Sequence, residues 1–107
     1  MFKNINPDTG KIPPVHPGEV LLEEFLKPWG LSQNQLAQHM GITAARLNEV
    51  VRGRRSVTGD TALRLARVTN TTPEFWLNLQ AQYDLETARD ALGDRLEKEV
   101  TPLPMAA

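Results

Sequence analysis

The pattern of hydrophobic and polar residues predicts a series of amphipathic helices. From residue 17 onward, apolar residues recur at the three- and four-residue spacing that turns one face of a helix toward a core. The predicted helices span residues 17–27, 32–40, 43–53, 58–68 and 73–99, and Gly93 is a break in the last of them. Apart from short ambiguous pieces before residue 16, no segment alternates as a half-buried strand would. The pattern therefore predicts an all-α fold of five to six short helices.

Residues at the predicted helix ends support these boundaries. Pro17 and Pro73 suit the first position of a helix, where the missing N–H removes no hydrogen bond. Ser32 and Gln35 have the spacing of a capping box. Thr43, Thr58 and Thr72 are residues that favour the N-cap. On the fourth helix we expect Leu63, Leu65, Ala66 and Val68 to be buried.

The two ends of the chain do not follow the helical pattern. Residues 1–15 hold three of the eight prolines and show no helical period, which predicts an extended N-terminal arm. The sequence "TPLPMAA" at the other end predicts a frayed tail. We therefore expect a flexible arm over 1–15, a helical domain over 16–92 and a tail over 93–107.

The stretch "LAQHMGITAARLNEVVRGRR", residues 36–55, raises the question of why a glycine interrupts good helical sequence. Two helices that meet at a steep angle within three or four residues need one residue at positive φ, which glycine adopts readily. Ala37 is small enough for a close helix crossing, and Leu47 and Val50 would face the same junction. Glycine alone would suit any αα-corner, but the set with Ile42 predicts a helix-turn-helix.

Charge is distributed unevenly along the chain. The net charge is −1, which taken alone argues against binding nucleic acid. Residues 46–55, however, carry four arginines and one glutamate, and residues 84–99 carry six acidic against three basic side chains. Local charge rather than the total attracts a phosphate backbone, so the basic segment is a candidate DNA surface. Two solvated faces with a chance bias are the alternative.

The third predicted helix would present its outward residues to the major groove. Those positions are Thr43, Ala44, Ala45, Arg46, Glu49 and Arg52. Arg46 is the one long donor there that can fork to guanine. Arg52, Arg54 and Arg55 lie at the helix end and in the following loop, where phosphate contact is expected, and Ser32 and Gln33 would form a second phosphate site. Solvation, or an Arg46–Glu49 or Glu49–Arg52 ion pair, is the alternative.

Residues 16–86 also resemble a known family. The segments "HPGEVL", "LNEVVRGRR", "TALRLAR" and "PEFWLNLQAQYDLE" are similar to the HigA group of plasmid-maintenance antidote proteins, in the XRE/Cro class of lambda-repressor-like helix-turn-helix regulators. The resemblance implies a homodimer that binds double-stranded operator DNA and represses its own operon. It also implies a partner, a HigB-like toxin resembling the RelE ribonucleases that cleave mRNA, which the antitoxin neutralises.

The resemblance implies functional residues as well. Carried over by motif, the DNA surface comprises Ser32, Gln33, Thr43, Ala44, Arg46, Asn48, Arg52 and Arg54, and the loop adds Arg55. Ala44 and Ala45 depart from the bulkier polar residues of many relatives, and alanine can contact a thymine methyl but cannot hydrogen-bond. Base reading would then rest on Arg46 and on DNA shape. The apolar helix beginning at Pro73 is expected to form the dimer, through Phe75, Trp76, Leu79 and Tyr83.

Other chemistry is not predicted. His16 before Pro17 is expected to contact a helix end, and two histidines without matching carboxylates do not suggest a metal site. No nucleophile–base set is readable, so we expect neither an enzyme nor a cofactor. The chain has no cysteine and no apolar run long enough to span a bilayer, which fits a cytoplasmic protein without a membrane partner.

Two alternatives to the antitoxin hypothesis remain. The first is a stand-alone XRE-family transcriptional regulator of the same fold with no toxin partner. The second is a protein-interaction module that sequesters a toxin and hardly binds DNA. A neighbouring toxin gene would separate the first from the antitoxin hypothesis, and salt-dependent operator binding would separate the second.

Overall fold

The structure, a computed structural model, describes residues 13–105, and every element in that range is helical. Most of the predicted arm, residues 1–12, lies outside the described residues. The elements are α1 (Pro17–Leu21), η1 (Leu22–Leu26), α2 (Lys27–Trp29), α3 (Gln33–Met40), α4 (Ala44–Val51), α5 (Gly59–Thr69), α6 (Pro73–Leu92) and α7 (Arg95–Glu99). The all-α prediction is confirmed.

The first predicted helix is continuous but not uniform. Segments α1, η1 and α2 follow one another without a break, and η1 is a π-helical turn in the middle. The helix ends at Gly30, whose φ of 64° is left-handed. The fifth predicted helix is divided as expected, because Gly93 at φ 53° separates α6 from α7.

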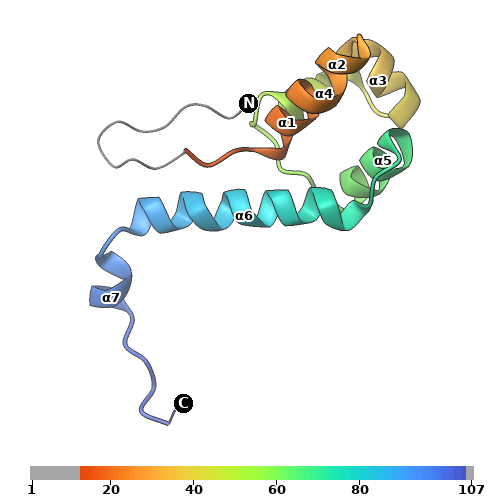
Figure 1. Cartoon of the computed structure of the whole chain (residues 1–107). Coiled ribbons are helices and arrows are strands. Elements are labelled where there is room, and N and C mark those ends of the chain that lie inside the picture. The colour runs from red at the N-terminus through yellow and green to blue at the C-terminus, as the bar shows by residue number, and fades with distance from the viewer. Residues whose placement is uncertain (1–12, 106–107) are drawn as a thin grey trace.

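The core lies between α1, α3, α4, α5 and the first half of α6. Its largest fully buried side chains include Trp76, Leu21, Leu47 and Leu65. Figure 1 shows α6 running past the other helices, so that its C-terminal half and α7 extend away from them. That half of α6 has no buried residue beyond Gln80.

The expected burial of Leu63 is wrong, because this side chain is 62% exposed. The buried residues of α5 are Thr61, Ala62, Leu65, Ala66 and Thr69, which lie on one face. Residues two apart on a helix point in very different directions, so Leu63 and Leu65 cannot share that face.

Gly18 marks the closest approach between α1 and α4. A Cβ atom built on Gly18 would lie 1.9 Å from the carbonyl oxygen of Val50 and 2.9 Å from the Cα of Val51. The two backbones are therefore in direct contact, which requires a residue without a side chain. His16 caps the same helix, since its Nδ1 accepts a hydrogen bond of 2.9 Å from the Gly18 N–H. The predicted helix-end role of His16 is confirmed.

Candidate nucleic-acid interface

Helices α3 and α4 form the predicted helix-turn-helix. Gly41 ends α3 with a φ of 71°, and the Ile42 N–H donates to the Ala37 carbonyl at 3.1 Å. Ala37 is 2% exposed and lies in the core with Leu47 and Val50. The glycine, the small residue and the apolar pair therefore have the roles that the sequence predicts.

The N-terminus of α3 is capped and linked to α4. The Ser32 hydroxyl accepts from the Gln35 N–H at 3.1 Å, and the Gln35 side chain accepts from the Ser32 N–H at 2.9 Å, so the capping box is confirmed. Across the junction, Asn48 Nδ2 donates to Gln33 Oε1 at 3.1 Å. The structure thus brings together Gln33 and Asn48, two of the predicted DNA-binding residues, from different helices.

The exposed face of α4 begins at its N-cap. The Thr43 hydroxyl accepts from the Arg46 N–H at 3.1 Å, and Ala44, Ala45 and Glu49 are exposed. This face is therefore small and weakly polar near its start. A surface of that shape can approach the base edges of a major groove closely.

Arg46 turns toward α5. Its Nη2 donates to Asp60 Oδ1 and to Thr61 Oγ1, both at 2.9 Å. Hydrogen bonds from Arg64 and then Arg46 lower the pKa of Asp60. The alternative pairing of Arg46 with Glu49 is wrong, because Glu49 pairs with Arg55. Base reading by Arg46 stays a prediction.

The arginine loop, residues 52–55, follows α4. Gly53 has a φ of 74°, and the N–H groups of Arg54 and Arg55 both donate to the Glu49 carbonyl. Arg55 Nη2 lies 2.9 Å from Glu49 Oε1, so its charge is partly engaged. Among the ion pairs of residues 13–105, none includes Arg52 or Arg54, and both side chains are exposed. The alternative Glu49–Arg52 pair is therefore absent from the described part of the chain.

Helix α6 anchors the end of this loop. The buried Val57 N–H donates to Gln80 Oε1 at 2.8 Å, and Gln80 Nε2 donates to Asp84 Oδ1 at 2.9 Å. Sequence analysis did not identify Gln80, because a polar residue on a long helix gives no indication of a distant backbone partner.

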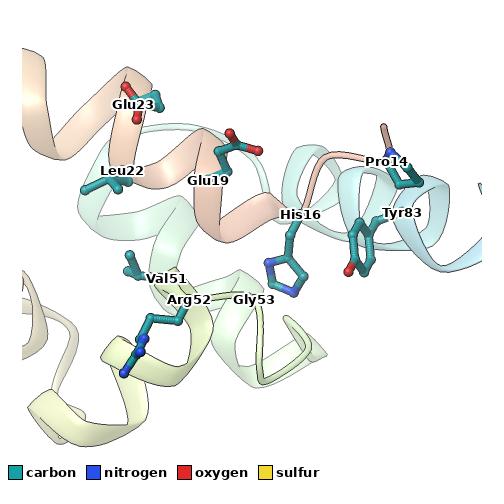
Figure 2. Close-up of a pocket in the computed structure, with 9 residues that line it drawn as sticks. All are labelled: Pro14, His16, Glu19, Leu22, Glu23, Val51, Arg52, Gly53 and Tyr83. Atoms are coloured by element: carbon teal, nitrogen blue, oxygen red, sulfur yellow. The ribbon is translucent and has the colours of Figure 1, made fainter. Parts of the chain in front are cut away.

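A hollow of about 370 Å³ lies between the first helix (α1 and η1) and the end of α4 with the start of the arginine loop, and Tyr83 of α6 borders it (Figure 2). Its lining includes His16, Arg52 and Tyr83. The rings of His16 and Tyr83 meet edge to face with centroids 4.9 Å apart. Burial lowers the pKa of His16, while Asp84 and a hydrogen bond to the Arg55 backbone act in the opposite direction. The His16 ring therefore contacts the first helix, the arginine loop and α6 at once.

The predicted dimer residues are distributed over α6 unequally. Trp76 is fully buried in the chain's own core, where a second chain cannot touch it, so its assignment to the dimer interface is corrected. Leu79 also packs against the core, and Tyr83 packs against His16, whereas Phe75 is 39% exposed. A separate apolar stripe, at the spacing of one helix face, lies on the exposed side: Leu77, Ala81, Leu85 and Ala88.

In residues 13–105 no group of three histidine, aspartate or glutamate side chains could hold a metal ion. Over the same range, no helix is both long and apolar enough to cross a membrane.

Comparison with known proteins identifies the family. A helix-turn-helix family model matches residues 22–76, which contain α3, α4 and α5. Antitoxin HigA-1 of Vibrio cholerae is 38% identical over 90 residues, which cover 84% of each chain. The chain belongs to the HigA-type antitoxins of the helix-turn-helix family.

Solved structures of HigA-type proteins have the same fold. An addiction module antidote protein of the HigA family from Coxiella burnetii has a TM-score of 0.80 and is 52% identical, covering 85% of this chain and 99% of that one. The Pseudomonas aeruginosa antitoxin HigA, solved with the higBA promoter, has a TM-score of 0.80 and is 42% identical, covering 84% of this chain and 98% of that one.

Proposed function

We propose that this HigA-type protein is a sequence-specific operator-binding repressor and the antitoxin of a type II toxin–antitoxin pair. The observation that carries the proposal is the complete helix-turn-helix, with Gly41 in the required conformation and the arginine loop directly after α4. The likeness to a HigA antitoxin solved with its promoter supports the same use of this surface.

Phosphate contacts fall at the two edges of the interface. Gln33 and the free N–H groups at the start of α3 form one edge, and Ser32 can still donate its hydroxyl hydrogen because the capping bond uses only its oxygen. Arg52 and Arg54 form the other, with Arg55 available once it leaves Glu49. Thr43, Ala44 and Asn48 are left for the base edges, together with the neighbouring Ala45 and Glu49.

The protein acts as a homodimer in this proposal. Two copies would meet through the apolar stripe of α6, because Leu77 is 39% and Leu85 53% exposed and both lie outside the chain's own core. A two-fold dimer places two copies of α4 about 34 to 36 Å apart, one helical turn of DNA.

The protein partner is a HigB-like toxin of the RelE type, neutralised in the cytoplasm by binding rather than by catalysis. This part of the proposal rests on membership of the HigA-type antitoxins. Co-expression with the product of an adjacent reading frame tests it. Growth rescue that survives loss of DNA binding separates toxin neutralisation from operator repression.

DNA titration tests the repressor function. We expect the full chain to bind the duplex upstream of its own gene more tightly than a shuffled duplex of equal length, at several salt concentrations. The logarithm of the affinity falls linearly with the logarithm of salt, because bound phosphates release counterions. Equal and weak binding of both duplexes would overturn the repressor function and favour a module that only sequesters a toxin.

A further inference from the structure

Asp60, in the first turn of α5, connects three parts of the interface. Its Oδ1 accepts hydrogen bonds from Arg46 Nη2 at 2.9 Å and from Arg64 Nε at 2.8 Å. Arg46 belongs to α4, whereas Asp60 and Arg64 lie one turn apart on α5. One carboxylate oxygen therefore joins α4 to α5.

Arg64 extends this connection to the turn of the helix-turn-helix. Its Nη1 donates to the Met40 carbonyl at 2.8 Å, in the last turn of α3. The same atom lies 3.1 Å from where a Cβ on Gly41 would stand, so the guanidinium covers the turn. Met40 cannot use that carbonyl within its own helix, because the helix ends there. The chain of contacts thus runs from α3 through Arg64 and Asp60 to α4.

The geometry at Arg46 limits what this side chain can do. Nη2 carries two hydrogens, and its two acceptors are Asp60 Oδ1 and Thr61 Oγ1. A guanidinium forks to guanine either through both terminal nitrogens or through Nε and Nη2, and both forks need Nη2. While the contacts to α5 persist, Arg46 cannot make the bidentate contact that its position in the sequence predicts.

We propose that Asp60 is a positioning residue of the DNA interface, which sets α4 against α5 and the turn through Arg46 and Arg64. Sequence is then read by the exposed residues of α4, and Arg46 holds that helix in place. This inference rests on the proposed operator binding. The Asp60 side chain is 58% exposed, and exposed ion pairs contribute little to stability. Replacing Asp60 should therefore change the orientation of α4 rather than the fraction of folded protein.

The experiment first lets the wild-type chain select its preferred duplex from a randomised library. The affinity for that duplex is divided by the affinity for a shuffled one, which cancels charge effects common to both. This ratio is measured for Asp60→Ala, Asp60→Asn, Arg46→Met, the double variant Asp60→Ala/Arg46→Met and the control Asp90→Ala. Asp90 is an exposed carboxylate on the C-terminal half of α6, and its replacement removes the same charge.

We expect Asp60→Ala and Arg46→Met each to lower the ratio by roughly fivefold or more, because contacting residues in one network are coupled. The double variant should lose no more than either single variant. Asp60→Asn keeps an acceptor oxygen and should retain most of the ratio, and Asp90→Ala should match wild type. Melting temperatures should change little, and the bases selected by Arg46→Met should stay the same.

Two results would overturn the inference alone. One is an Asp60→Ala variant with the wild-type ratio of affinities for the selected and shuffled duplexes. The other is the loss of one guanine from the sequence that Arg46→Met selects, because this would show that Arg46 reads that base. If Asp60→Ala fails to fold, Arg46→Met still tests the link between α4 and α5, because it leaves the Asp60–Arg64 pair intact. A wild-type chain that selects no sequence overturns the proposed operator binding itself, and this inference with it.

Discussion

At Gly18, the absence of a side chain allows α1 and α4 to approach as closely as they do. Gly18→Ala should destabilise the fold by about 1–3 kcal/mol or more, because the added methyl overlaps the Val50 carbonyl and the backbones must separate. Denaturant unfolding of wild type and variant measures the loss. Gly59→Ala is the matched control, since a Cβ there meets nothing within 4 Å. Equal loss in both variants would show that glycine content, not the α1–α4 contact, is responsible.

His16 should make stability depend on pH. Burial lowers its pKa in the folded chain, so the unfolded chain binds the proton more readily. The contribution of His16 is complete above its unfolded pKa of about 6.5 and is lost as pH falls toward the lower folded value. Protonation of Nδ1 would also remove the cap on Gly18.

Melting temperatures at about pH 7.5 and about pH 5.5 check this expectation, in a window around the unfolded pKa. The wild type should melt lower at the acidic pH. His16→Asn can still cap the helix but does not titrate, so it should lose much of that dependence. A variant with the wild-type pH profile would place the titrating group elsewhere.

Local residue roles could be predicted, and roles set by distant partners could not. The caps at Ser32, Thr43 and Thr72 and the glycine at 41 follow from neighbours within a few residues. The need for glycine at position 18 and the partner of Arg46 depend on elements brought close only by folding. For Arg46, Glu49 at helical spacing was a nearer acceptor in sequence than Asp60, and Glu49 instead binds Arg55.

At the scale of elements, the arginine loop should supply much of the salt dependence of DNA binding. Arg54→Ala should weaken specific and non-specific binding alike. It should also reduce the slope of log affinity against log salt by about 0.9 per lost phosphate contact, or about 1.8 in a symmetric dimer. Arg67→Ala is the control, because it removes an exposed arginine from α5, outside the proposed interface. If Arg54→Ala kept the wild-type slope, Arg54 would not contact a phosphate.

Helix positions follow from the sequence more reliably than helix faces. The predicted boundaries agree with the structure to within about two residues, with the first helix continuing to Trp29 and α4 ending at Val51, and the break at Gly93 separates α6 from α7 as predicted. On α5, however, Leu63 is apolar but exposed, because the helical period places it on a different side from Leu65; hydrophobic character alone therefore does not identify the buried face. The turn of the helix-turn-helix was clear because glycine, a small residue and an apolar pair must coincide there.

At the scale of the whole molecule, dimerisation should depend on the outward stripe of α6. Leu85→Lys should give a monomer at micromolar concentration, because a charge would have to be buried between two copies. It should bind a single half-site where wild type occupies two. Sedimentation and titration of one- and two-site duplexes measure both. As a control, Leu63→Lys introduces the same charge at an exposed leucine of α5 and should remain dimeric. A dimeric Leu85→Lys would show that this stripe is not the dimer interface.

The proposed dimer surface could be assigned from the sequence to a helix, but not to one side of it. Both sides of α6 carry apolar residues, and the sequence does not show which side belongs to the chain's own core. The structure places Trp76 inward and Leu77 outward, so neighbouring residues belong to different surfaces. The division of the chain at residues 15 and 92 stays a prediction.

The contact of Gln80 with Val57 fixes how α6 is rotated about its own axis relative to the rest of the chain. The Gln80 side chain holds the Val57 amide on one side of the helix, while the stripe from Leu77 to Ala88 occupies another. One residue inserted after Ala81 would turn everything beyond it by about 100° while leaving the Val57 contact in place. A dimer formed through the turned half would present its two arginine loops at a different angle. In the proposed dimer, the number of residues in this helix would therefore set how the two DNA-binding surfaces are placed relative to each other, whichever side chains touch DNA.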